Sequence, residues 1–138
     1  MQVDTITYSV IDSVKNTNAL IESWDNGIIY IKIDDSTETS LEDSMSQYNY
    51  IKSKYDGVNK LRILVEPGKF TSISKEAREF SAKPENNLMT MASAVIIKSL
   101  AQRIVINFMI NVIQRQTMKM KIFEDKYKAM DWLLSLKA

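Results

Sequence analysis

The chain has 138 residues, 45% of them hydrophobic and 25% charged, which fits one folded domain and argues against a disordered chain. It contains neither cysteine nor histidine, so disulfides, Cys/His zinc sites, thiol nucleophiles and imidazole bases are excluded. The net charge is +1, but residues 1–56 carry ten acidic residues against four lysines, whereas residues 57–138 carry seven against fourteen Lys and Arg. The basic half could attract an anionic partner, or the two halves could fold together and cancel.

Residues 1–18 alternate weakly between apolar and polar side chains, which fits an edge strand or a flexible N-terminal arm. The runs "ALIESW" and "IIYIKID" follow, separated by "DNG". Asn-Gly and Asp-Gly pairs supply the positive φ angles of tight turns, so we expect a hairpin of residues 19–25 and 28–34.

A helix is predicted next, because Thr39 and Glu42 have the spacing of a capping box and Gly57 is a stop signal. The run "KLRILVE" is nearly continuous in apolar residues, which is typical of a central strand covered on both faces. A turn at Pro67-Gly68 leads to a short helix with Ser74 as N-cap.

Glu66 ends this central strand, and ligands of open α/β sheets commonly bind at such strand ends. Polar side chains in the following loop could form an anion-binding or phosphorylation site with it. This candidate cluster consists of Glu66, Lys69, Thr71, Ser72, Ser74 and Arg78. The simpler interpretation is a polar loop in which Ser74 only caps the helix.

The remaining chain predicts a strand in "SAVIIKS", a long helix over residues 99–115, a strand in "MKMKIFED" and a final helix capped by Asp125. The segment "LMTM" (residues 88–91) could be a soft lid over an apolar ligand or could fill core space. Strands alternating with helices indicate an α/β fold with a mixed or parallel sheet, and we expect a single domain over residues 1–138.

The long helix is apolar over roughly 240°, far more than the ~100° stripe of an ordinary surface helix. We expect one half to lie on the sheet, and its residues are Ala101, Ile104, Val105, Phe108 and Val112. The other half needs a second cover: another helix of the domain, a second subunit or protein partner, or an apolar molecule. The candidate interface or apolar-ligand residues are Ile106, Met109, Ile110 and Ile113.

We expect no cofactor or metal, because the Asp34-Asp35 pair lacks a third oxygen ligand at calcium-loop spacing. No nucleic-acid site is expected, because such sites interleave aromatic with basic residues, and between Asn86 and Phe123 only Phe108 falls among the basic residues. No run approaches the ~18 to 20 apolar residues of a membrane span, and the N-terminus lacks a signal-peptide pattern, so a cytoplasmic location is expected.

Three segments, "ILVEPGKFTSISKEAREF", "ASAVIIKSLAQRIVINFMI" and "KMKIFEDKYKAMDWL", resemble the SpoIIAA-like, STAS-related domains of bacteria. The resemblance implies a mixed sheet of about four to five strands with helices packed on its faces. It also implies a non-catalytic protein that acts through protein contacts. The Asp-x-Ser-Gly phosphorylation motif of such proteins is replaced here by "EPGKFTSIS", where Ser72 and Ser74 are the nearest substitutes. A relation to CRAL-TRIO lipid carriers implies an apolar pocket beneath helix 99–115 as the alternative function.

Overall fold

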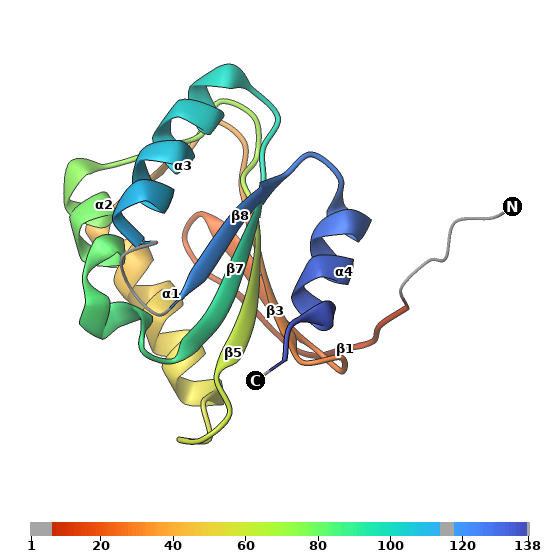
Figure 1. Ribbon diagram of the computed structural model, residues 1–138. Coiled ribbons are helices and arrows are strands. Elements are labelled where there is room, and N and C mark those ends of the chain that lie inside the picture. Colours follow the sequence, from red (N-terminus) through yellow and green to blue (C-terminus); the bar gives the residue numbers. More distant parts are fainter. Residues whose placement is uncertain (1–6, 114–117, 138) are drawn as a thin grey trace, which may run out of the picture.

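The computed structural model describes residues 7–113 and 118–137, and for Ile113 it describes the place in the helix but not the side chain (Figure 1). The main sheet has six strands in the order β1-β2-β3-β5-β7-β8, so the expected four to five were too few. Its strands are β1 (Val10–Lys15), β2 (Ala19–Trp24), β3 (Ile28–Ile33), β5 (Leu61–Glu66), β7 (Thr90–Ile96) and β8 (Lys119–Phe123). The additional strand is β1, which lies at one edge of the sheet, as the first of the two interpretations of residues 1–18 predicted.

The sheet is mixed, as expected. Strands β1, β2 and β3 are antiparallel neighbours, whereas β3, β5, β7 and β8 run parallel to one another. The predicted hairpin is confirmed, with Ala19 opposite Ile33 and Gly27 at the turn with a φ of 91°. Strand β5 lies between β3 and β7, which explains its continuous apolar run. A second, two-stranded parallel sheet joins β4 (Glu38–Thr39) and β6 (Ser72–Ile73).

The helices cover the two faces of the main sheet unequally. Figure 1 shows α1 (Leu41–Lys54), α2 (Lys75–Ala82) and α3 (Leu100–Ile113) on one face and α4 (Lys126–Ser135) on the other. A short 3-10 helix, η1 (Pro84–Asn87), connects α2 to β7. Among the described residues, no helix has the length and the apolar character that crossing a membrane requires.

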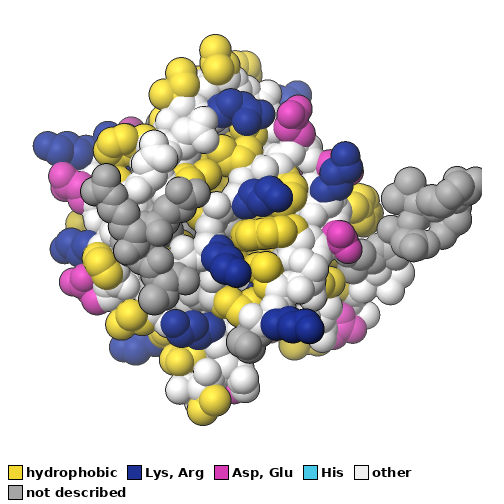
Figure 2. All heavy atoms as spheres, viewed as in Figure 1, with side chains coloured by type: hydrophobic (Ala, Val, Ile, Leu, Met, Phe, Trp, Pro, Cys, Tyr) yellow, Lys and Arg dark blue, Asp and Glu magenta, His cyan; other side chains and the backbone are white. Residues whose placement is uncertain are grey.

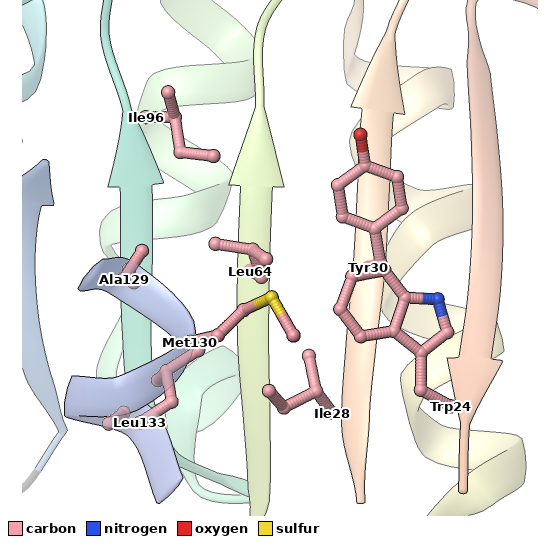
Figure 3. Packing of buried hydrophobic residues seen from close by; sticks show 10 residues of the cluster. Trp24, Ile28, Tyr30, Leu64, Ile96, Ala129, Met130 and Leu133 are labelled. Atoms are coloured by element: carbon pink, nitrogen blue, oxygen red, sulfur yellow. The ribbon is translucent and has the colours of Figure 1, made fainter. Parts of the chain in front are cut away.

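The face under α4 is closely packed. Figure 3 shows Met130 of α4 lying over Ile28 and Leu64 of the sheet, and all three side chains are fully buried. Arg62 of β5 fastens the end of this helix, because its Nε and Nη2 donate hydrogen bonds of 2.8 and 2.7 Å to the carbonyl oxygens of Leu133 and Leu136. Burial of this apolar surface stabilises the domain.

The helix caps follow the sequence with one correction. The capping box of α1 is formed by Ser40 and Asp43, one residue later than the predicted Thr39 and Glu42. Thr39 instead lies in β4, where its hydroxyl accepts a hydrogen bond of 3.2 Å from Asn18. Asp125 caps α4 as predicted, by accepting a hydrogen bond from the Tyr127 amide.

Basic side chains gather over β8, the second edge of the sheet, where Figure 2 shows them separated by hydrophobic groups. In this region the Lys121 ammonium lies 5.3 Å from the ring of Phe123 and 5.9 Å from that of Trp132. Lysines on an edge strand oppose its pairing with a strand of another molecule, which explains the basic side chains over β8.

Candidate ligand cavity

A cavity of about 340 Å³ lies between the sheet and the helices α1, α2 and α3. Its floor is formed by side chains of the three parallel strands β3, β5 and β7, namely Ile31, Ile33, Ile63, Val65, Ser93 and Val95. These three strands are interior strands of the main sheet. Its volume lies in the range of small-molecule sites, which is about 300 to 1,000 Å³.

The α1 wall of the cavity follows helical spacing. Ser44, Gln47, Tyr48 and Ile51 all line it, because residues three, four and seven apart share one helix face. Tyr48 meets Phe80 of α2 edge to face, with ring centroids 5.8 Å apart and an interplanar angle of 90°, and this pair joins the two helices.

The α3 wall is formed by the inward side of the long helix. Gln102, Ile106 and Met109 face the cavity and are almost fully buried. Two further methionines, Met118 and Met120, line the cavity at the start of β8. Methionine side chains are flexible and polarizable, so this wall can adapt to ligands of different shape.

Gln102 fixes the first turn of α3 to the loop that follows β5. Its Nε2 donates hydrogen bonds of 2.8 Å to the Gly68 carbonyl and 3.3 Å to the Thr71 hydroxyl, and its Oε1 accepts one of 2.8 Å from the Lys98 amide. Gly68 is required there, because a Cβ at this position would collide with the side chain of Asp35 and the backbone of Ile33. Loop and helix therefore close one end of the cavity together.

Of the five residues predicted to lie on the sheet, Ala101, Ile104 and Phe108 are exposed, so the prediction was wrong for these three. Ile104 and Phe108 are 62% and 63% exposed, and Leu100 is 73% exposed. Val105 and Ala101 both line the cavity, although Ala101 is exposed to solvent. The helix is rotated relative to the expectation because Gln102, a polar residue, is held inside by its hydrogen bonds.

Of the four candidate interface or ligand residues, Ile106 and Met109 point inward. Ile106 and Met109 are only 6% and 7% exposed and pack with Val95 and Ile97, so they are not available to a second subunit. Ile110 packs at the edge of the same cluster. The side chain of Ile113 lies outside the described residues. As cavity-lining residues, Ile106 and Met109 fit the apolar-ligand alternative.

The predicted anion or phosphorylation cluster is not assembled. Glu66 points toward the α4 face and is 15% exposed, where its carboxylate accepts hydrogen bonds of 2.5 Å from Tyr30 and 3.0 Å from Lys98. The Lys32 ammonium lies 3.7 Å away. Burial alone raises the Glu66 pKa, but Tyr30, Lys98 and Lys32 outweigh it, and the pKa lies below its ordinary value. Burial, with the neighbouring Glu66, raises the pKa of Tyr30.

The other members of that cluster have separate positions. Thr71 and Ser72 line the cavity on the opposite side of the sheet from Glu66. Ser74 caps α2 by accepting a hydrogen bond of 3.1 Å from Ala77, as the simpler interpretation predicted. Arg78 donates a hydrogen bond of 2.6 Å to the Ile73 carbonyl, and the Lys69 amide donates one to Asp35.

Gln47 and Gln102 are site residues that were not predicted from the sequence. Gln47 could have been found from its helical spacing, because it lies four residues before Ile51 and so shares the inward face of α1 with it. The Nε2 of Gln47 is buried and has no hydrogen-bond partner among the described residues. The segment "LMTM" was predicted as a possible lid, but its Leu88 is 57% exposed and does not line the cavity. Thr90 is the residue of this segment that lines it.

The mixed sheet with three helices on one face and one on the other places the chain in the class of SpoIIAA-like α/β domains, as the sequence resemblance implied. A solved structure of an uncharacterized DUF3478-family protein with a SpoIIAA-like fold, from Shewanella loihica PV-4, is similar, with a TM-score of 0.57 and 14% identity. The match covers 96% of this chain and 99% of that chain. The chain belongs to the family described as Domain of unknown function (DUF7793), whose model matches residues 22–137. Comparison with curated proteins gave no match.

Proposed function

We propose that the domain is a non-catalytic binding protein that holds a small, mainly apolar molecule in the cavity beneath α3. The observation that carries the proposal is the cavity of about 340 Å³ walled by three helices and floored by β3, β5 and β7. Its lining is mainly apolar with a few polar side chains, and its volume is that of small-molecule sites, which are commonly built in this way.

The non-catalytic part of the proposal follows from the position of Glu66, the acid that the sequence offers at a strand end. Its carboxylate is engaged by Tyr30 and Lys98, and its lowered pKa keeps it ionised and weakly basic. Such a group is a poor general acid and a poor general base at neutral pH.

Native mass spectrometry of protein incubated with a cellular small-molecule extract tests the ligand proposal. We expect a bound compound on the natural chain and its loss in Ser93→Phe, which would fill the cavity floor. Ser13→Phe in the exposed strand β1 is the matched control and should retain the compound. A mass equal to that of the bare natural chain after this incubation would contradict the proposal.

The outer side of α3 favours a second function, contact with another copy of this chain. Leu100, Ile104 and Phe108 recur at every fourth residue and form an exposed apolar ridge. Ridges of this spacing interdigitate when helices pack, and two identical ridges can meet across a twofold axis. This contact replaces the one predicted through Ile106 and Met109, which are buried.

Sedimentation velocity at micromolar concentration tests this contact. We expect a dimer for the natural chain and a folded monomer for Ile104→Lys. Ser13→Lys in the exposed edge strand β1 is the control that should leave the dimer intact. A natural chain that sediments as a monomer would exclude the contact.

A further inference from the structure

We infer that the occupant of the cavity is an uncharged molecule carrying an oxygen that accepts a hydrogen bond from Gln47. The inference rests on the proposed ligand-binding function and specifies the class of ligand. Two independent features of the lining carry it: its lack of charge and the unpartnered amide of Gln47.

No Asp, Glu, Lys or Arg occurs among the described residues that line the cavity. The polar groups there are the hydroxyls and amides of Ser, Thr, Tyr, Asn and Gln. A buried ionised group without a partner of opposite charge has a large desolvation cost. A free carboxylate or phosphate would therefore bind much more weakly than a neutral molecule of the same shape.

Gln47 supplies the directional contact. Its Nε2 is buried, has no acceptor among the described residues and belongs to a side chain that lines the cavity. A buried donor without a partner is costly, so a ligand oxygen placed against it removes this cost on binding. Carbonyl, ether and hydroxyl oxygens can all accept this hydrogen bond.

The size of the cavity limits the ligand to a small molecule. The volume of about 340 Å³ lies near the lower end of the range of small-molecule sites, about 300 to 1,000 Å³. The ligand is then an apolar body of this order of size with one polar end, in contact with Met109, Met118 and Met120.

Three probes of nearly equal shape test the inference: acetophenone, which has a neutral acceptor; benzoate, which is charged; and ethylbenzene, which has no acceptor. Binding is measured by titration of protein with ¹³C-labelled methionine methyl groups. Met109, Met118 and Met120 report on the cavity, and Met130 on the opposite face is the internal reference. We expect saturable shifts of the three cavity methyls, with acetophenone binding at least tenfold more tightly than benzoate.

Gln47→Leu should weaken acetophenone about fivefold, the effect of one hydrogen bond, and change ethylbenzene by less than twofold. Asn49→Leu, an amide replaced on the exposed side of α1, should change neither affinity. Benzoate binding as tightly as acetophenone, or an unchanged acetophenone affinity in a folded Gln47→Leu variant, would overturn the inference and leave the ligand-binding function standing. If none of the three probes shifts the cavity methyls and native mass spectrometry finds no bound compound, the proposed function fails, and the inference with it.

Discussion

Gln102 and Gly68 are joined by a hydrogen bond of 2.8 Å between the glutamine Nε2 and the glycine carbonyl oxygen, 34 residues apart in the chain. The bond fixes the rotation of α3, because the only inward polar side chain of its first turn is held at the loop after β5. This rotation determines which side chains of α3 face the cavity and which face solvent.

Replacing Gln102 by leucine should therefore loosen the start of α3. The Gly68 carbonyl and the Lys98 amide would lose their partners, and we expect a loss of about 1 to 3 kcal/mol in the free energy of unfolding. Urea denaturation measures the loss, and faster amide exchange in the first turn of α3 should accompany it. Asn107→Leu on the exposed side of the helix is the control, and an equal loss there would contradict the explanation.

Two isoleucines of α3 should respond very differently to truncation. Ile106→Ala removes a buried side chain and should cost about 2 to 5 kcal/mol in the free energy of unfolding. Ile104→Ala removes an exposed one and should cost about 0.5 kcal/mol or less in the monomer. Denaturation at low protein concentration measures both; similar costs would show that the helix has another rotation.

Arg62→Ala should release the end of α4. The carbonyl oxygens of Leu133 and Leu136 lose a charged donor, so we expect the free energy of unfolding to fall by about 2 kcal/mol. Lys60→Ala, an exposed cation just before the same strand, should be nearly neutral. Thermal melts of the two variants make the comparison, and a Lys60 effect as large as that of Arg62 would mean that general charge loss is responsible.

Gly68→Ala should destabilise the protein although glycine is not needed there for a positive φ. The added methyl group would meet the Asp35 side chain and the Ile33 backbone, and overpacking of this kind costs about 1 to 3 kcal/mol. Gly68→Ala and Asp35→Ala together should recover part of the loss, because one of the colliding groups is removed. If the double variant is no more stable than Gly68→Ala, the added methyl group collides with the backbone alone and not with the Asp35 side chain.

Stability should depend on the ionisation of Glu66 at acid pH. Its pKa in the folded protein lies below the ordinary value of 4.5, so its stabilising contribution is fully present above that value and is lost as the pH falls through the lowered pKa. Between pH 6 and pH 3 the natural chain should lose more stability than Glu66→Gln. Parallel slopes for the two proteins in urea titrations at each pH would show that Glu66 is not perturbed.

The sequence predicted features that depend on local patterns. The hairpin at Gly27 and the central position of β5 follow from turn chemistry and apolar runs, and both are confirmed. The rotation of α3 could not be predicted, because a helix that is apolar on most sides does not indicate its inward side. The grouping of Glu66 with Thr71 and Ser72 was wrong for a related reason. Strand β5 is covered on both faces, so its apolar residues do not alternate with polar ones, and the sequence did not show that Glu66 lies on the face covered by α4.

Because the two faces of the sheet are covered by different helices, the packed core under α4 and the residues that line the cavity are separate sets of side chains. The layer under α4, with Met130 over Ile28 and Leu64, is packed from side chains that do not line the cavity. Substitutions at Gln47, Ser93 or Met109 change the interior of the other layer and leave this one intact. Members of one family could in this way diverge in ligand preference while retaining the same architecture.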